Sequence, residues 1–309
     1  MNSLNLTGLV AATYTPLDSK GDVNTPVVRP MVDHLLESGV GGLYVCGSTG
    51  EGISLTSDER KSVAHTFVEA VEGRVPVIVQ VGHNSLAEAR QLAEHAQQIG
   101  ADAVSATCPS YFKVTEVVAL TECMAEIASA APDLPFYYYH IPALTGSTMD
   151  VMEFLRRGPA SIPNLVGIKY TDTKLHEFQQ CLEFNGGQFD VVWGCDEMLL
   201  GALATGARAA IGSTYNIAAP LYGQLIAALA RGDLDKARIC QSRSVAMIHT
   251  LKQFPFHAAM KSVLAMNGLD VGGCRLPQGY LTEADRVELK NRLQSIGFFD
   301  WSQPAHNET

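Results

Sequence analysis

Residues 164–171 have the sequence NLVGIKYT, in which Leu165, Val166 and Ile168 place apolar side chains on both faces of an extended segment. Such a strand is typical of a parallel sheet covered by helices on both sides. Similar apolar runs lie at 8–16, 41–47, 75–82, 102–109, 135–142, 189–196 and 208–214. The segments between them have helical spacing, as at 84–99, and Thr56…Glu59 and Ser85…Glu88 have the pattern of capping boxes. The sequence therefore predicts eight consecutive strand–helix units.

Eight such units with right-handed crossovers close most naturally into a (β/α)₈ TIM barrel, an α/β fold. A doubly wound open sheet is the alternative, although no GxGxxG follows any of the predicted strands. Beyond residue 217 the strands cease, and helical patterns cover 218–230, 233–253, 256–267 and 283–295. We expect residues 1–217 to supply the barrel strands and most helices. Residues 218–309 would add the last barrel helix and a C-terminal helical extension within one continuous catalytic unit.

Composition restricts the class of protein. Of the 309 residues, 47% are apolar and 17% are charged, which excludes an intrinsically disordered chain. No apolar stretch approaches the roughly 20 residues of a membrane-spanning helix, and the first residues do not resemble a signal peptide. The net charge of −10 argues against nucleic-acid or anionic-membrane partners. We therefore expect a soluble, cytoplasmic protein with a small-molecule partner.

Polar residues gather where the predicted strands end, which is where TIM barrels build their chemistry. These strand-end candidates are Ser48, Thr49, Tyr111, Tyr139, Lys169, Asp196, Glu197, Gly212 and Ser213. Because the carboxyl ends of all strands meet at one mouth of a barrel, their convergence predicts a functional site there.

Lys169 carries the sharpest argument because it interrupts an otherwise apolar strand. Burying an ammonium group is costly, so this lysine either points into the barrel mouth or is paired. Desolvation would lower its pKa and create a free amine, a Schiff-base nucleophile for a carbonyl substrate. A lysine that extends to a carboxylate at the strand end is the alternative, and the pattern leaves both open.

Two further features at the mouth have a functional and a purely structural interpretation. Tyr139 ends a run of three tyrosines, and its phenol would relay protons or would simply be a hydrogen-bonded core aromatic. The segment GSTGEG at 47–52 contains Ser48 and Thr49, whose hydroxyls and backbone N–H groups suit a carboxylate. It would otherwise be a tight turn without a ligand.

The acidic residues, histidines and cysteines also have both a functional and a structural interpretation. Asp196 and Glu197 would accept hydrogen bonds from sugar hydroxyls, or would cap the following helix. His83 and His140 each lack a second ligand at metal spacing, so we expect no metal site. The seven cysteines are odd in number and form no CxxC pair, which disfavours disulfides, zinc and a catalytic thiol.

The motifs GSTGEG (47–52), YHIPALTG (139–146), GIKYT (167–171) and IGSTYN (211–216) together resemble the N-acetylneuraminate lyase/dihydrodipicolinate synthase family of class I aldolases. The resemblance extends from about residue 6 to about residue 295, with the motifs in order. It implies a TIM barrel, no metal or organic cofactor, and usually a homotetramer. IPALTG, and WGCDE followed by GSTYN, most resemble the branch that cleaves N-acetylneuraminate reversibly to N-acetylmannosamine and pyruvate.

The resemblance also implies residue roles. Lys169 would form the imine with the 2-keto acid, Tyr139 would relay protons, and Ser48 and Thr49 would hold the carboxylate. The residues implied to bind the hydroxylated chain are Thr171, Gly194, Asp196, Glu197, Gly212 and Ser213. Tyr44 and Tyr111 match supporting tyrosines, and the latter often reaches into a neighbouring subunit in this family.

Some features depart from the family pattern or leave other activities open. His140 stands where relatives commonly have Asn or Asp, and Gly52 replaces a larger residue, so substrate preference could differ. The synthase branch has an arginine shortly after the tyrosine motif, whereas Ala143, Leu144 and Thr145 offer none. The alternatives are a 2-keto-3-deoxy sugar acid aldolase, a dihydrodipicolinate synthase-like condensing enzyme, a metal-dependent class II aldolase and an inactive sugar-acid-binding barrel.

Overall fold

The structure is a computed structural model, and it describes residues 4–302. Eight parallel strands form a closed barrel in which each strand pairs with the next and β8 pairs with β1. The strands are β1 (Gly8–Ala12), β2 (Gly42–Val45), β3 (Val77–Gln80), β4 (Ala103–Ala106), β5 (Phe136–His140), β6 (Leu165–Tyr170), β7 (Asp190–Trp193) and β8 (Ala209–Gly212). Every predicted strand is present, so the TIM barrel is confirmed and the open sheet is wrong.

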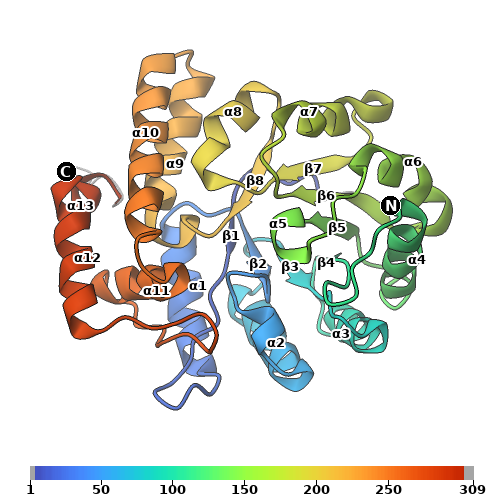
Figure 1. Ribbon diagram of the computed structural model, residues 1–309, viewed down its shortest axis with the longest axis horizontal. Coiled ribbons are helices and arrows are strands. Elements are labelled where there is room, and N and C mark those ends of the chain that lie inside the picture. The colour runs from blue at the N-terminus through green and yellow to red at the C-terminus, as the bar shows by residue number, and fades with distance from the viewer. Residues whose placement is uncertain (1–3, 303–309) are drawn as a thin grey trace.

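Helices lie around the outside of the strands (Figure 1). The α-helices of the barrel are α1 (Val28–Glu37), α2 (Ser57–Val71), α3 (Leu86–Gln98), α4 (Val117–Ala128), α5 (Pro142–Thr145), α6 (Val151–Ser161), α7 (Leu175–Glu183), α8 (Leu199–Ala204) and α9 (Tyr215–Ala230). Short 3₁₀ turns are η1 (Thr25–Val27), η2 (Gly52–Ser54), η3 (Phe184–Gly186) and η4 (Asp196–Met198). The predicted capping box of Thr56 and Glu59 is formed, and the Ser85 side chain accepts from the Glu88 N–H.

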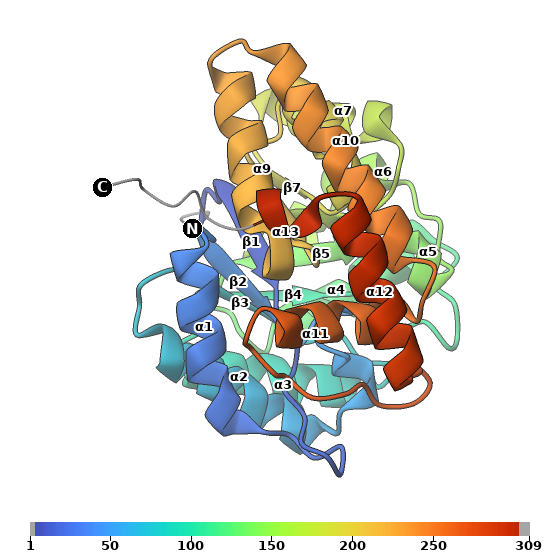
Figure 2. The ribbon, with the colours of Figure 1, turned by 90° about the vertical axis from the view of Figure 1, so that its left-hand side faces the viewer.

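The C-terminal part of the chain is helical, as the patterns predicted. It contains α10 (Leu234–Leu251), α11 (Phe256–Met266), α12 (Glu283–Ser295) and α13 (Phe298–Trp301). Figure 2 shows α11 and α12 on the side that faces the viewer, where both contact α10. In the described part of the chain, no helix is long and apolar enough to cross a membrane.

Alternation along the strands divides the core into two layers. Tyr137 and Tyr139 belong to the cluster inside the barrel, whereas Tyr138 packs in the layer between strands and helices. The same alternation places Ile168 and Tyr170 in the outer layer, so Lys169 between them faces the barrel interior. The fold therefore aims Tyr139 and Lys169 at the same enclosed space.

Candidate active site

Lys169 and Tyr139 are direct neighbours on adjacent parallel strands, because Tyr139 of β5 is in register with Lys169 of β6. The Lys169 Nζ lies 4.0 Å from the centre of the Tyr139 ring and 3.8 Å from the centre of the Tyr44 ring. Its side chain is buried, and none of the ion pairs among residues 4–302 includes it. The lysine thus points into the barrel, not outward to a surface carboxylate.

The surroundings of Lys169 change its protonation. Burial among the tyrosine rings lowers the pKa of its ammonium to about 7, although the Asp196 carboxylate partly opposes this effect. A large share of the amine is therefore uncharged at neutral pH, and only the uncharged amine can attack a carbonyl carbon. The electrostatic requirement for imine formation is met by the folded chain itself.

Tyr139 is held by aromatic and polar contacts. Its ring packs edge-to-face on Tyr44, with 5.7 Å between the ring centres, and the Tyr44 hydroxyl donates to Ser105 Oγ over 3.1 Å. Burial raises the pKa of Tyr139 to about 12, while the side chains of Ser48 and Thr171 favour the phenolate and limit the rise. The phenol is therefore protonated at rest and has two hydroxyl groups placed to stabilise its anion.

The turn at 47–52 joins two strand ends at the mouth. Thr49 Oγ1 and Ser213 Oγ share a hydrogen bond of 2.7 Å, which connects the ends of β2 and β8. A Cβ atom at Gly52 would lie 2.0 Å from the carbonyl oxygen of Cys46, so this turn cannot accept a side chain here without moving its backbone. Backbone packing thus explains why residue 52 is a glycine. The effect of Gly52 on substrate preference stays a prediction.

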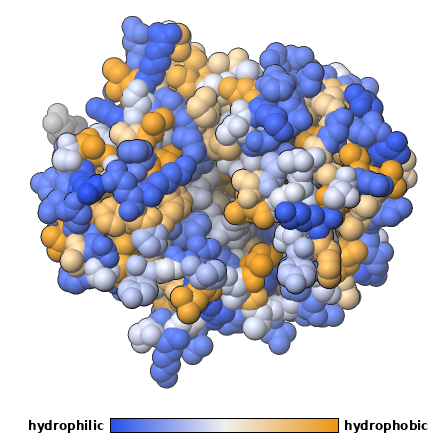
Figure 3. All heavy atoms as spheres, viewed as in Figure 1, coloured by the Kyte–Doolittle hydropathy of each residue, from blue (hydrophilic) through white to orange (hydrophobic). Residues whose placement is uncertain are grey.

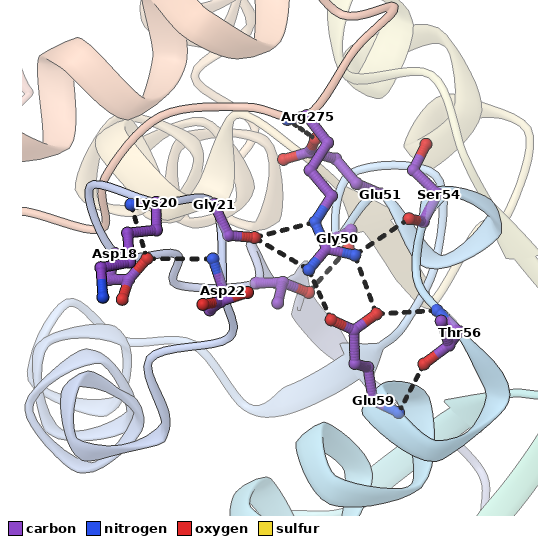
Figure 4. Close-up of polar contacts among 11 residues, drawn as sticks. Asp18, Lys20, Gly21, Asp22, Gly50, Glu51, Ser54, Thr56, Glu59 and Arg275 are labelled. Carbon is purple, nitrogen blue, oxygen red and sulfur yellow. Dashed lines mark hydrogen bonds and ion pairs between the residues drawn. The ribbon is translucent and has the colours of Figure 1, made fainter.

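The turn is fastened from outside by residues that sequence reasoning missed. Glu51 pairs with Lys261 of α11 over 2.9 Å, and both side chains are 1% exposed. The Arg275 backbone N–H also donates to Glu51 Oε2 over 2.7 Å, and its guanidinium pairs with Glu59 (Figure 4). Lys261 lies in the apolar helix FHAAMKSVLAM, so the argument that singled out Lys169 would also have found this lysine.

Asp196 and Glu197 diverge after β7. Asp196 is buried, and its Oδ2 accepts from the backbone N–H and the hydroxyl of Thr214 over 2.8 and 2.6 Å. Its Oδ1 has no hydrogen-bond partner within the described chain. Burial raises the pKa of Asp196 to about 6. Glu197 is more exposed and pairs over 3.0 Å with Lys252, the residue that follows α10.

Two predicted glycines lie beside these polar groups. A Cβ at Gly212 would lie 1.9 Å from Asp196 Oδ1, and a Cβ at Gly194 would lie 2.0 Å from Thr171 Oγ1. Both positions therefore admit only glycine while the carboxylate and the hydroxyl stay where they are. The structure thus assembles Thr171, Gly194, Asp196, Gly212 and Ser213 on one side of the barrel mouth.

Within one chain, the Tyr111 side chain does not lie with these residues at the barrel mouth. It lies between β4 and α4, is 79% exposed, and contacts the 84% exposed Phe112 through its ring. The sequence placed Tyr111 at the mouth because it follows a strand, but the loop carries its side chain to the surface. A supporting role for Tyr111 in its own subunit is not supported by this position.

A cavity of about 330 Å³ opens beside the turn that contains Ser48. It is lined by residues that follow β2, β3, β4 and β5 and by the C-terminal part, including Ser48, Gln80, Thr107, Ile141, Leu144 and His257. Figure 3 shows the same face hollowed near its middle, with hydrophilic and hydrophobic residues mixed around the rim. The cavity gives a small polar molecule room near the strand ends.

Comparisons with known proteins agree with this geometry. The model of the dihydrodipicolinate synthetase family matches residues 5–296. N-acetylneuraminate lyase from Xenopus tropicalis is 46% identical over 238 residues, which cover 76% of this chain and 78% of that protein. The Mus musculus enzyme of the same name is 38% identical, covering 98% of this chain and 96% of its own. The structure of Proteus mirabilis N-acetylneuraminate lyase superposes with a TM-score of 0.92 at 38% identity, covering 95% and 99% of the two chains.

Proposed function

This chain belongs to the dihydrodipicolinate synthetase family, and on that premise we propose that it is a Schiff-base aldolase that cleaves N-acetylneuraminate to N-acetylmannosamine and pyruvate. One observation carries the chemistry: a buried lysine with a pKa of about 7 lies between two tyrosine rings at the barrel mouth. The substrate follows from relatives named N-acetylneuraminate lyase that match nearly the whole chain.

The reaction begins when the uncharged amine of Lys169 attacks C2 of the open-chain 2-keto acid. The resulting carbinolamine loses its hydroxyl group as water, with Tyr139 giving up its phenolic proton. The products of this step are a protonated imine and a phenolate, and the hydroxyls of Ser48 and Thr171 stabilise the latter. The positive imine nitrogen stabilises the phenolate further, because opposite charges favour each other's ionised forms.

Carbon–carbon cleavage uses the imine as an electron sink. The Tyr139 phenolate takes the proton of the C4 hydroxyl, the C3–C4 bond breaks, and its electron pair moves into an enamine while the aldehyde leaves. Tyr139 then returns the proton to C3, which restores the protonated imine and the phenolate. Water hydrolyses the imine to pyruvate and the free amine of Lys169, and the proton released in this step returns to the Tyr139 phenolate. One tyrosine thus moves a proton in each step, which is the role of a general acid and base.

Substrate positioning is assigned to the two sides of the mouth. The hydroxyls of Ser48 and Thr49, with the backbone N–H groups of their turn, suit the carboxylate of the 2-keto acid. The unpartnered Oδ1 of Asp196 supports a hydrogen bond from a sugar hydroxyl, and Glu197 and Ser213 offer further acceptors. Thr171, Gly194 and Gly212 complete this side of the site.

A homotetramer in the cytoplasm is part of the same proposal. Tyr111 and Phe112 form an exposed aromatic pair next to the mouth-forming loops, and such a pair suits burial against a second copy of this chain. Light scattering coupled to size-exclusion chromatography tests this assembly. A monomer would contradict it, and a tetramer that dissociates when both residues are replaced by serine would support it.

The proposed function is tested by trapping the imine and by following the products. Borohydride added with pyruvate should inactivate the protein and attach one reduced pyruvyl group to Lys169. Lys261 is the matched control, because it is equally buried but neutralised by Glu51, and it should carry no adduct. An adduct elsewhere, or none, would contradict the mechanism. If the protein cleaved a shorter 2-keto-3-deoxy acid faster than N-acetylneuraminate, the shorter acid would become the assigned substrate.

A further inference from the structure

A second cluster of ligand atoms lies outside the barrel, behind the strand that carries Tyr139. It consists of His140 at the end of β5, Asp172 in the loop after β6, and Glu177 in the first turn of α7. One ligand atom of each residue lies within 4.8 Å of those of the other two. The spacing of these residues along the chain does not reveal the cluster. Its members come together because β5 pairs with β6.

His140 is held with one ring nitrogen facing the two carboxylates. Its ring packs on Tyr170, with 5.3 Å between the ring centres, and its Nδ1 lies 3.5 Å from the Tyr138 hydroxyl. When Nδ1 carries the ring proton, it donates to the Tyr138 oxygen, and the lone pair then lies on Nε2.

This Nε2 atom has no hydrogen-bond partner in the described part of the chain, and His140 is 1% exposed. Leaving a buried polar atom without a partner is unfavourable, so this acceptor favours a ligand. Burial also lowers the pKa of His140 to about 4, so its imidazole is neutral at neutral pH. A neutral imidazole aimed at carboxylates is the form that ligates a metal ion.

The carboxylates are positioned by their own neighbours. Asp172 Oδ2 lies 4.0 Å from His140 Nε2 and 3.1 Å from the ammonium of Lys174. Glu177 Oε1 accepts from the Tyr170 hydroxyl over 2.7 Å. Such bonds to the second layer of residues are typical of metal ligands, since they fix the direction of the donor atoms. Lys174 thus places a positive charge beside the Asp172 carboxylate, where it would compete with a bound cation.

We propose that His140, Asp172 and Glu177 bind one divalent transition-metal ion, best matched by Zn²⁺, in competition with the Lys174 ammonium. A donor set of one imidazole and two carboxylates suits Zn²⁺, and a water molecule would complete four-coordination. Bonds of about 2.0–2.2 Å require ligand atoms about 3.3–3.6 Å apart. Ligand atoms that lie up to 4.8 Å apart must therefore approach one another by up to about 1.5 Å, and Lys174 must swing toward solvent.

The ion would be structural and would not touch the substrate. Tyr139 directly precedes His140, and Thr171 directly precedes Asp172. A metal bridge between His140 and Asp172 therefore ties together the backbone that presents the phenol and the hydroxyl, from the opposite side of the strands. This site is independent of the imine chemistry, so the two proposals succeed or fail separately.

Calorimetric titration of Zn²⁺ into the EDTA-treated full chain tests the proposal, with the Tm measured in parallel. We expect one Zn²⁺ per chain, a raised Tm and much weaker binding of Mg²⁺. His140→Asn and Glu177→Gln should each weaken binding at least tenfold. Lys174→Met should strengthen it, because the competing ammonium is gone. His65→Gln is the matched control, since it removes an exposed histidine–glutamate pair and should leave the affinity unchanged.

Two results would overturn the site. One is Zn²⁺ binding that survives both His140→Asn and Glu177→Gln, and the other is a Lys174→Met variant that binds no tighter than the starting protein. If His140→Asn fails to fold by circular dichroism, the Glu177→Gln and Lys174→Met variants still decide the question. Titration with Co²⁺ tests the cysteines as ligands. A thiolate charge-transfer band would assign the ion to them, and its absence would exclude them.

Discussion

The ammonium of Lys261 lies 2.9 Å from the carboxylate of Glu51, and both side chains are 1% exposed. The pair links helix α11 of the C-terminal part to the turn that carries Ser48 and Thr49. Lys261 also donates to the carbonyl oxygens of Thr15 and Gly273, so its ammonium has two hydrogen bonds in addition to the ion pair. The C-terminal helices therefore hold the proposed carboxylate-binding turn in place through a buried charge.

Replacing Lys261 with methionine should lower the free energy of unfolding by about 3–5 kcal/mol, because it leaves the Glu51 carboxylate buried without its cation. Urea unfolding measures this loss. The double variant Glu51→Gln/Lys261→Met should lose less than the sum of the single variants. Arg238→Gln, which breaks an exposed pair with Asp235, is the control and should cost no more than about 1 kcal/mol. If Lys261→Met lost as little stability as Arg238→Gln, the buried pair would contribute no more than an exposed one.

Imine formation should depend on pH through Lys169. Because burial lowers the pKa of this amine to about 7, its uncharged fraction rises from about one tenth at pH 6 to about nine tenths at pH 8. The initial rate of imine formation with pyruvate should therefore increase about tenfold over this range. Rapid mixing followed by a borohydride quench measures it. A midpoint near 10, typical of an exposed lysine, would contradict the assigned environment.

Tyr139→Phe keeps the aromatic ring over Lys169 and removes only the hydroxyl. Carbon–carbon cleavage should fall by about 10²–10⁴-fold, the usual contribution of a general acid and base. An adduct with pyruvate should still form on Lys169, but more slowly, because the phenol no longer supplies the proton for dehydration of the carbinolamine. Product release and trapped adduct, measured on the same preparation, separate the two effects. Tyr44→Phe is the matched control, since its hydroxyl bonds to Ser105 and is not assigned a proton transfer. If Tyr139→Phe cleaved the substrate nearly as fast as the starting protein, another group would have to relay the proton.

Asp196→Asn and Glu197→Gln should each reduce kcat/KM for N-acetylneuraminate by about ten- to a hundredfold, through the loss of a charge-assisted hydrogen bond. Only Asp196→Asn should also shift imine formation to lower pH, because the Asp196 charge raises the pKa of Lys169. Lys252→Met is the control for Glu197, since it removes the ion-pair partner and keeps the carboxylate. Equal loss of cleavage and of imine formation would assign the two acids a structural role.

Lys169→Met should stabilise the protein while abolishing imine formation. The pKa of Lys169 is about 7 in the folded chain, below the ordinary value of 10.5, so burying the ammonium costs stability at every pH below 10.5. The gain from methionine should be complete below pH 7, at up to about 5 kcal/mol, and should shrink as the pH rises toward 10.5. Urea unfolding at pH 6.5 and 9.5 measures it, with the exposed Lys290→Met as control. A gain that does not depend on pH would contradict the burial of a charge.

Much of the molecule could be predicted from short stretches of sequence. Apolar runs with β-branched residues marked all eight strands, because a strand covered on both faces must be apolar on both faces. Lys169 was found for the same reason, since a charge in such a strand violates that requirement. These properties depend on residues close together in the chain. The pattern left open whether Lys169 points into the barrel or pairs with a carboxylate, and the structure places it on the inner face beside Tyr139.

Other relationships were decided only by the tertiary structure. The Glu51–Lys261 pair and the cluster of His140, Asp172 and Glu177 join segments whose proximity depends on barrel closure and strand register. Likewise, the sequence assigned Asp196 and Glu197 the same candidate role, whereas folding buries Asp196 beside Thr214 and pairs Glu197 with Lys252. Local periodicity determines which face a side chain occupies, but the partner that it meets there is set by how distant segments pack.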